Sequence, residues 1–309
     1  MKEYCVGIGA ANVDITGRSF NKLVMQDSNP GCMHVCAGGV TRNVLENLAR
    51  LGGDCKLVTI IGNDVQGNLI LKSCKDVGID TSNIIIKKNG ISSTYMAILA
   101  DNGDMELALS DMRILQNLSP EELEKRKKVI LNAKAVTLDP CLPEKAIEYI
   151  VENFSDKVPL FCDPVSTAYA KRIKPYVSKI HTIKPNKMEL EVLTDMPCNS
   201  KKEVVEACHK LVEQGVKRVF VTAGSKGCIY YDYLGNSVFK SLKPVDYIVN
   251  ASGAGDSFTS GIIYGFLNDL SIDETIDIAL ACGKLCILSE DTINPDMSIE
   301  MVKGIIERG

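Results

Sequence analysis

A run of small residues near the C-terminal end of the chain leads into an apolar stretch that is typical of a buried helix. Gly253-Ala254-Gly255-Asp256 precedes the apolar run Ile262 to Leu267. The first N–H groups of a helix have no partner inside it, so they can bind an anion, and small side chains let that anion approach. The Asp256 carboxylate could then accept the proton of an attacking hydroxyl while the N–H groups hold a phosphoryl group. An ordinary helix start with a favourable acidic residue would give the same pattern.

A second glycine-containing turn follows a predicted strand, in the run Thr222-Ala223-Gly224-Ser225-Lys226-Gly227. Its backbone could bind phosphate. The run has neither the spacing nor the terminal Lys-Ser/Thr pair of a Walker A loop, so a P-loop enzyme is not expected. A plain turn into the next strand explains the run equally well.

The first predicted strand is followed by a polar pair, Asn12 and Asp14. Open α/β sheets bind ligands at the carboxyl ends of their strands, and residues two apart in an extended chain share a face. The oxygens of the pair suit the adjacent hydroxyls of a sugar, although Asn and Asp also form turns. The run that begins at Gly7 imitates a dinucleotide fingerprint, but Asn12 stands where the third glycine should be, so an oxidoreductase is not expected.

The start of another predicted helix could serve the same ligand. Gly38-Gly39 precedes that helix, so Gly39 could allow the ligand close to the backbone, and Asn43 could reach it from the first turn. A loose entry into the helix is the alternative.

A further helix start places two polar side chains on one face. Asn186 and Glu189 follow Lys184-Pro185 and lie three residues apart. This spacing fits a capping box. It would also suit Mg²⁺ held through its bound waters, because magnesium keeps most of its hydration shell in proteins.

Buried-type strands alternate with amphipathic helices along most of the chain. We predict strands at 4–9, 56–61, 135–138, 160–162, 182–183 and 218–222, and helices at 41–51, 65–77, 120–132, 143–153, 186–194 and 200–214. This alternation is typical of a doubly wound, mainly parallel α/β sheet flanked by helices. We therefore expect a single α/β domain over residues 1–309.

Two segments interrupt the alternation. Residues 14–37 are polar, turn-prone and too long for an ordinary connection. Residues 92–111 consist of two predicted strands, Thr94 to Ala100 and Met105 to Leu109, joined at Asn102-Gly103, which favours a type I′ hairpin turn. We expect the two segments to form a small antiparallel sheet that stands off the domain as a lid over a ligand.

The composition indicates a small-molecule partner. Of the 309 residues, 45% are hydrophobic and 24% charged, and the formal net charge is −4. A net negative charge does not favour binding to nucleic acid or to an anionic membrane. The sequence has no long apolar run and does not begin with a signal-peptide pattern, so we expect a cytoplasmic protein. The twelve cysteines lie mostly in apolar stretches, as reduced core residues do, and Cys32 and Cys36 lack a second ligand pair for zinc.

The order of these motifs resembles that of the ribokinase-like (PfkB-type) carbohydrate and nucleoside kinases over almost the whole chain. The resemblance implies that Asp256 is the general base and that Gly253, Ala254 and Gly255 form an anion hole with it. It assigns Lys184, Asn186, Thr222, Gly224 and Gly227 to ATP, Glu189 to Mg²⁺ through water, and Asn12, Asp14, Gly39 and Asn43 to the sugar.

Five runs are most similar to the branch of this family that acts on pseudouridine: Asp27 to Gly31, Gly38 to Asn43, Asp163 to Ser166, His181 to Asn186 and Asn294 to Asp296. This likeness implies transfer of the γ-phosphate of ATP to the 5′-hydroxyl of that nucleoside, with the lid residues Ser93, Thr94 and Asp111 near the base. The alternatives are a kinase for uridine, inosine, ribose or fructose, and a nucleoside-binding regulator without turnover. An exposed lid edge could also pair two subunits as a homodimer.

One position departs from the family pattern. Members that are activated by a monovalent cation carry an aspartate six positions before the base, and Asn250 stands there. A neutral amide lacks the charge that favours a bound cation. We therefore expect ATP and Mg²⁺ as cofactors and leave a requirement for K⁺ open.

Overall fold

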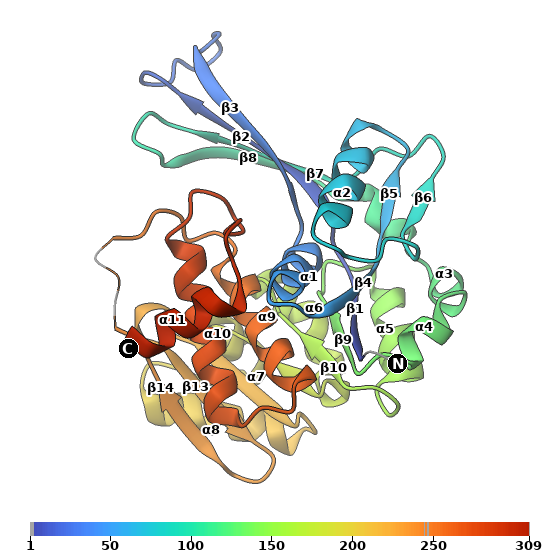
Figure 1. Ribbon diagram of the computed structural model, residues 1–309, viewed down its shortest axis with the longest axis vertical. Helices are drawn as coiled ribbons and strands as arrows, with labels where there is room; N and C mark the ends of the chain where they lie inside the picture. The colour runs from blue at the N-terminus through green and yellow to red at the C-terminus, as the bar shows by residue number, and fades with distance from the viewer. Residues whose placement is uncertain (1–2, 244, 246, 309) are drawn as a thin grey trace.

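The centre of the molecule is an eight-stranded sheet with helices on both faces (Figure 1). The computed structural model describes residues 3–243, 245 and 247–308. The strand order is β14-β13-β12-β11-β10-β9-β1-β4. The six strands from β12 to β4 run parallel, and β13 and β14 add an antiparallel edge. The strands are β1 (Tyr4–Ile8), β4 (Asp54–Val58), β9 (Ala135–Leu138), β10 (Leu160–Cys162), β11 (Thr182–Ile183), β12 (Arg218–Thr222), β13 (Cys228–Asp232) and β14 (Ser237–Lys240).

Alternate residues of the central strands enter two separate apolar clusters, one on each face of the sheet. In β10, for example, Leu160 and Cys162 belong to one cluster and Phe161 to the other. The first cluster includes α3 (Pro120–Glu124), α4 (Lys127–Leu131), α5 (Glu144–Phe154), α6 (Thr167–Ile173), α7 (Lys187–Thr194) and α8 (Lys201–Glu213). The second includes α1 (Val40–Arg50), α2 (Val65–Asp76), α9 (Ala254–Leu267) and α10 (Ile272–Ile287). Burial on both faces explains why these strands are continuous apolar runs.

The remaining elements lie around this centre. The last helix, α11 (Ile299–Arg308), packs on α10 through a third, smaller cluster. A two-stranded sheet pairs β5 (Ile60–Gly62) with β6 (Ile85–Lys87), and three short 3₁₀ helices are η1 (Arg113–Asn117), η2 (Lys174–Lys179) and η3 (Gly224–Lys226). Within residues 3–243, 245 and 247–308, no helix has the length and apolar character needed to cross a membrane.

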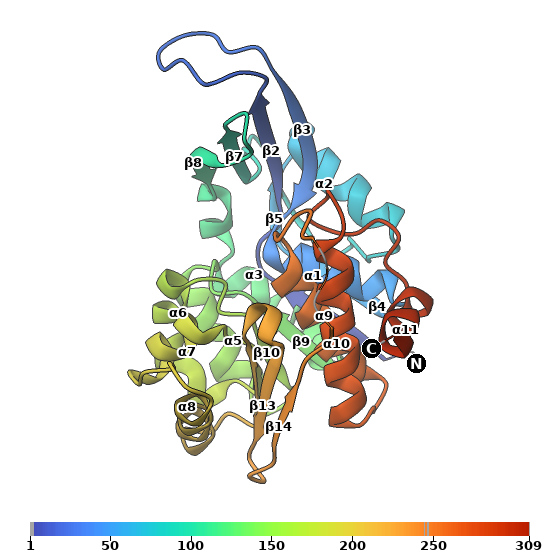
Figure 2. The ribbon, with the colours of Figure 1, turned by 90° about the vertical axis from the view of Figure 1, so that its left-hand side faces the viewer.

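A second sheet of four strands projects from the domain (Figure 2). Its order is β3-β2-β7-β8, formed by β2 (Asn12–Ser19), β3 (Gly31–Gly38), β7 (Thr94–Leu99) and β8 (Met105–Asp111). The pairs β2–β3 and β7–β8 are antiparallel hairpins, and the central pair β2–β7 is parallel. Since β1 runs almost directly into β2, and β3 into α1, this lid sheet is attached at the carboxyl edge of the main sheet.

The predicted fold class is confirmed: the main sheet is mainly parallel, helices cover both faces, and a smaller sheet stands apart. Two elements differ in detail. The predicted helix 120–132 is interrupted, because α3 ends at Glu124 and α4 begins at Lys127. The predicted strand 56–61 is broken at Thr59, whose hydroxyl donates to the Gly9 carbonyl (2.7 Å).

The predicted type I′ turn in the lid is wrong. That turn needs positive φ at both central residues, and in the pair Asn102-Gly103 only Gly103 has it (φ 91°). The N–H of Ala100 donates to the Asp104 carbonyl (2.8 Å), and the N–H of Gly103 donates to the Ala100 carbonyl (3.0 Å). The hairpin therefore closes with a three-residue loop whose last residue is a left-handed glycine, a common alternative.

Candidate active site

The carboxyl ends of neighbouring parallel strands deliver polar side chains to one place. Asp139 follows β9, Asp163 follows β10, Lys184 follows β11, and Thr222 ends β12. The first three are nearly inaccessible to solvent. Ligands bind at this edge in open α/β sheets, because the strand ends and helix starts leave backbone groups free there.

The start of α9 is shaped by a glycine that no other residue could replace without strain. Gly253 caps the helix with a left-handed backbone (φ 77°), and a Cβ on it would collide with the carbonyl oxygen of Thr292. The first helical hydrogen bond runs from Ser257 N–H to the Gly253 carbonyl (2.9 Å). The N–H groups of Ala254, Gly255 and Asp256 therefore come before the first hydrogen-bonded turn, as an anion hole requires.

Asp256 lies in the first turn of α9, deep in the molecule but with part of its side chain accessible. Its Oδ2 accepts a hydrogen bond from Asn43 Nδ2 at 2.9 Å, across 213 residues of sequence. Burial raises the pKa of Asp256 to about 7, and the nearby Asp163 carboxylate adds to the rise, while Asn43 and Lys184 oppose it. A carboxylate whose pKa lies near neutrality is well matched to the work of a general base.

Lys184 lies beside this helix start. Its Nζ forms an ion pair with Asp163 Oδ2 at 2.7 Å, and the Thr259 hydroxyl contacts the same oxygen at 3.2 Å. A Cβ on Gly255 would lie 2.9 Å from Lys184 Nζ, so the glycine leaves room for the ammonium group. Burial lowers the pKa of Lys184, but the surrounding carboxylates outweigh this effect and the net pKa is raised. The ammonium group is thus kept charged beside the start of α9.

Asn186 and Glu189 form the capping box that their spacing also allowed. The Asn186 side chain accepts from Glu189 N–H, and Glu189 Oε2 accepts from Asn186 N–H, both at 2.9 Å. Glu189 is buried, which raises its pKa. The metal-ion role of Glu189 stays a prediction. No cluster of three or more His, Cys, Asp or Glu side chains suited to a metal ion occurs in the described part of the chain.

The residues predicted to hold the sugar gather where the lid meets α1. Asn12 Nδ2 donates to Asp14 Oδ1 at 2.6 Å, and burial raises the pKa of Asp14. A Cβ on Gly38 would collide with the Asp14 carboxylate, and one on Gly39 (φ 101°) would lie 2.6 Å from the Ala10 carbonyl oxygen. Glycine is therefore required at Gly39, whereas a side chain at Gly38 would displace the Asp14 carboxylate.

Two of the three lid residues predicted to read the base, Thr94 and Asp111, lie on the same face of the lid sheet. Residues opposite each other in a sheet point the same way, and neighbours along a strand point opposite ways. Thr94 is opposite both Val13 and Asp111, whereas Asp14 is opposite Tyr95. Thr94 and Asp111 therefore lie on the face away from Asp14, whereas Ser93 precedes β7 and is buried.

The predicted ATP loop lines a cavity of about 420 Å³. Thr222, Gly224 and Gly227 form one side, and Ala254 and Gly255 of α9 form another. The rest of the lining is mostly apolar and was missed by sequence reasoning: Leu242, Val245, Ile248, Ala251, Phe258, Leu280, Gly283 and Ile287, with Ser225, Lys243 and Lys284. The cavity thus connects the loop after β12 with the start of α9.

Two more polar groups near Asp256 were not predicted as site residues. Asp139 accepts from Ala10 N–H (2.8 Å) and from the Thr41 hydroxyl (2.7 Å), and Asp163 pairs with Lys184. Their signal is that each is the first polar residue after a buried strand, as Asn12 is after the first strand.

Comparisons with known proteins agree with this geometry. The sequence profile of the pfkB family carbohydrate kinases matches residues 2–299. A pseudouridine kinase of Escherichia coli (strain K12) is 31% identical over 306 residues, which cover 99% of this chain and 97% of that protein. The uncharacterized sugar kinase YeiI of the same strain is 32% identical, covering 99% and 84%. The structure of Arabidopsis thaliana ribokinase complexed with ribose and ATP superposes with a TM-score of 0.88 at 23% identity, covering 99% of both chains.

Proposed function

The chain belongs to the pfkB family of carbohydrate kinases, phosphotransferases that act on an alcohol group, and on that premise we propose that its acceptor is the 5′-hydroxyl of pseudouridine. The position of Asp256 carries the proposal of a general base: it lies at a helix start, accepts a hydrogen bond from Asn43, and follows Gly255, which lines the cavity. The likeness to a pseudouridine kinase over nearly the whole chain supports this acceptor. The similar identity to a sugar kinase keeps another nucleoside or a free sugar as the alternative.

In the proposed reaction, Asp256 accepts the proton of the 5′-hydroxyl while the hydroxyl oxygen forms a bond to the γ-phosphorus. The bond from that phosphorus to the β-phosphate oxygen breaks, and ADP leaves. The N–H groups of Ala254 and Gly255 stabilise the charge on the transferring group, and Lys184 adds a fixed positive charge beside them. Mg²⁺, when bound, would neutralise the phosphate oxygens, and Asn186 and Glu189 are the residues proposed to hold its waters.

An assay of ADP release against pseudouridine, uridine, inosine, ribose and fructose tests the acceptor. We expect the highest kcat/KM for pseudouridine, because an acceptor placed for its extra ring N–H would be left unpaired by uridine. Equal kcat/KM for uridine and pseudouridine would contradict the assignment. Thermal shifts with a nucleoside but no ADP release would instead indicate a regulator without turnover.

We further propose that the enzyme does not need K⁺. Asn250 uses both ends of its amide inside the protein: Nδ2 donates to the Glu290 carbonyl (3.0 Å), and Oδ1 accepts from Ser252 N–H (2.9 Å). A carbonyl engaged by an N–H donor is a poorer cation ligand. Replacing K⁺ by tetramethylammonium at constant ionic strength should change kcat by less than about twofold, whereas a bound activating cation would give a much larger loss.

The outer face of the lid supports the proposal of a homodimer. Five large apolar residues on β3 and β8 are exposed: Met33, Val35, Met105, Leu107 and Leu109. The strand register places Val35, Leu107 and Leu109 on the face away from Asp14. Exposed apolar faces of this kind are typical of interaction sites. Light scattering should give about twice the chain mass for the native protein and the monomer mass for a Leu107→Lys, Leu109→Lys variant; a native monomer would contradict the proposal.

A further inference from the structure

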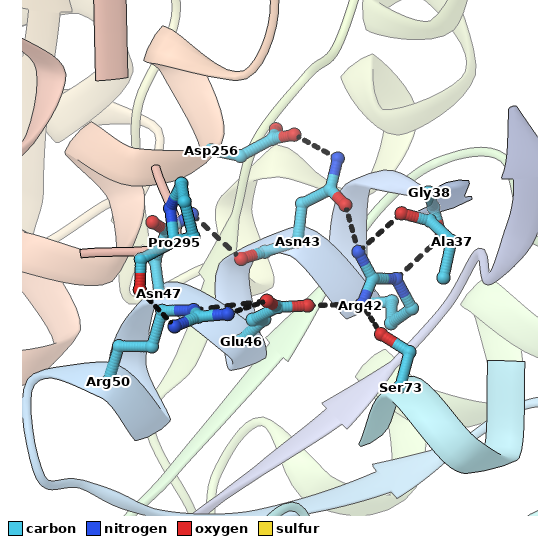
Figure 3. Close-up of polar contacts among 10 residues, drawn as sticks. All are labelled: Ala37, Gly38, Arg42, Asn43, Glu46, Asn47, Arg50, Ser73, Asp256 and Pro295. Atoms are coloured by element: carbon cyan, nitrogen blue, oxygen red, sulfur yellow. Dashed lines mark hydrogen bonds and ion pairs between the residues drawn. The ribbon is translucent and has the colours of Figure 1, made fainter. Parts of the chain in front are cut away.

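A buried arginine next to the site takes no part in the proposed reaction steps. Arg42, in the first turn of α1, is 1% exposed. Removing a guanidinium group from water is costly unless its donors are satisfied. All five of its N–H donors have partners, from three different segments of the chain (Figure 3). Because every donor of the planar guanidinium group is used, the Arg42 side chain is held in one position.

Two of these partners are the last carbonyl groups of the lid strand β3. Arg42 Nε donates to the Gly38 carbonyl at 3.0 Å, and Nη2 donates to the Ala37 carbonyl at 2.6 Å. These carbonyls stand at the junction where the lid leads into α1. A third bond, from Nη1 to the Ser73 hydroxyl at 3.1 Å, ties the same group to α2.

The next partner connects Arg42 to the proposed base. Nη2 donates to Asn43 Oδ1 at 3.0 Å, and Nδ2 of the same Asn43 amide donates to Asp256 Oδ2 at 2.9 Å. An amide has an acceptor at one end and donors at the other, so a flipped Asn43 would present its oxygen to the carboxylate and its NH₂ group to the guanidinium. Both contacts would then be repulsive. The guanidinium therefore selects the one orientation of Asn43 that donates to Asp256.

The charge of Arg42 is balanced away from Asp256. Its Nη1 pairs with Glu46 Oε2 at 2.5 Å, and Arg50 binds the other Glu46 oxygen, Oε1, at 2.8 Å. Arg50 also donates to the Pro295 carbonyl at 2.5 Å (Figure 3). The charged groups with the largest effects on the pKa of Asp256 include Asp163, Lys184 and Asp139. Arg42 is connected to the base by hydrogen bonds through the Asn43 amide.

We propose that Arg42 is a positioning residue for phosphoryl transfer: it locks the Asn43 amide in the orientation that donates to Asp256 and couples that orientation to the base of the lid. The inference rests on the proposed function of Asp256 as the base. The lid junction and the base then share one guanidinium group, so a displaced junction would release the amide as well.

The variant Arg42→Lys tests this role, because lysine keeps the charge but replaces the rigid five-donor fork by one nitrogen with three donors, which cannot keep all five hydrogen bonds. We expect kcat, with the best acceptor, to fall about tenfold, as loss of one well-placed hydrogen bond to a charged group predicts. The acid limb of the pH profile of kcat/KM should move to higher pH, because the carboxylate loses a donor. The control Ser73→Ala removes a bond of Arg42 that does not involve Asn43, and should leave kcat and the acid limb unchanged.

A double-mutant cycle separates positioning from general loss of stability. In an Asn43→Ala background, Arg42→Lys should change kcat by less than about twofold, because its effect passes through the missing amide. An equal tenfold loss in both backgrounds would overturn the inference. If Arg42→Lys fails to fold, the same cycle can be run with Glu46→Gln, which weakens the hold on Arg42 without removing it. We then expect a smaller loss of kcat, which should also disappear in the Asn43→Ala background. An equal loss in both backgrounds would again overturn it.

The outcome is distinguishable from failure of the proposed base. Asp256→Asn with near-normal turnover would contradict the function of Asp256 whatever the cycle shows. An inactive Asp256→Asn together with a fully additive cycle would contradict only the role of Arg42.

Discussion

The two walls of the candidate site are made of opposite kinds of residue. On the acceptor side, Asp256, Asn43 and Asp14 take part in hydrogen bonds within the protein. On the side proposed for ATP, the cavity is lined mainly by apolar side chains such as Phe258 and Leu280 and by glycine backbone. Directed bonds fix where reacting atoms lie, whereas apolar contact adds binding with little dependence on direction. We therefore expect changes in the polar wall to lower kcat and changes in the apolar wall to raise the KM for ATP.

The largest effect should come from the polar wall. Asp256→Asn removes the proposed base with almost no change in shape, so kcat should fall by about 10²–10⁴, the usual contribution of a general base, with the KM for ATP nearly unchanged. Steady-state kinetics of ADP release measure both constants. Asp269→Asn, just beyond the other end of α9, is the matched control and should keep normal turnover. A loss smaller than about tenfold in Asp256→Asn would limit that residue to positioning the substrate.

A backbone change where the two walls meet should come next. Gly253→Ala would force a left-handed alanine against the Thr292 carbonyl, so the start of α9 must shift. We expect kcat to fall by roughly 10- to 100-fold, as the loss of anion-hole donors predicts. Gly235→Ala is the control, since Gly235 has a similar φ of 83° and nothing within 4 Å of an added Cβ. It should cost about 1 kcal/mol of stability and leave kcat unchanged. Similar kcat values for the two variants would remove the anion hole from the mechanism.

Changes in the apolar wall should alter the KM for ATP rather than kcat. Leu280→Ala removes apolar area from the cavity, so the KM for ATP should rise about fivefold while kcat changes less than twofold. Leu234→Ala, at an exposed position in the turn between β13 and β14, is the control for general effects. If Leu280→Ala lowered kcat and left the KM for ATP unchanged, the proposed division of roles between the polar and apolar walls would be contradicted.

The smallest effect concerns stability rather than rate. Because the pKa of Asp256 is raised to about 7 in the folded protein, the folded state keeps a proton that the unfolded state releases near pH 4. The contribution of Asp256 to the free energy of unfolding is therefore fully present below pH 4 and is lost as the pH rises toward 7. Asp256→Asn should therefore have a higher Tm than the wild type at pH 8 and an equal Tm at pH 4. Scanning calorimetry at both pH values measures this. A lower Tm for the variant at pH 8 would show that the carboxylate is stabilised in the fold.

The parts of the site that sequence could predict are those encoded by neighbours in the chain. Gly253 to Asp256 and Gly39 with Asn43 each combine a glycine turn and a helix start within a few residues, and the structure places both as helix starts. The apolar periodicity similarly located most strands and helices, because burial depends on the local pattern. The contact between Asn43 and Asp256, by contrast, joins residues 213 positions apart.

The parts that were missed depend on tertiary packing. Arg42 looks like an ordinary helix residue until Ala37, Gly38 and Ser73 are placed around it. The faces of Thr94 and Asp111 follow from a strand register that pairs β7 with β2, which no local pattern specifies. The apolar wall combines Leu242, Ile248 and Phe258 with Leu280 and Ile287, which are far apart in the sequence, so no single motif marks it.

The parallel pairing of β2 with β7 has a consequence for how the protein emerges from the ribosome. The hairpin of β2 and β3 is complete at Gly38, but its partner β7 begins only at Thr94, after α1, β4, β5, α2 and β6. If the hairpin forms before Thr94 has been synthesised, the β2 edge that later pairs with β7 is open to association with other strands. During synthesis there is therefore a stage at which β2 and β3 are complete but β7 and β8 have not yet been made.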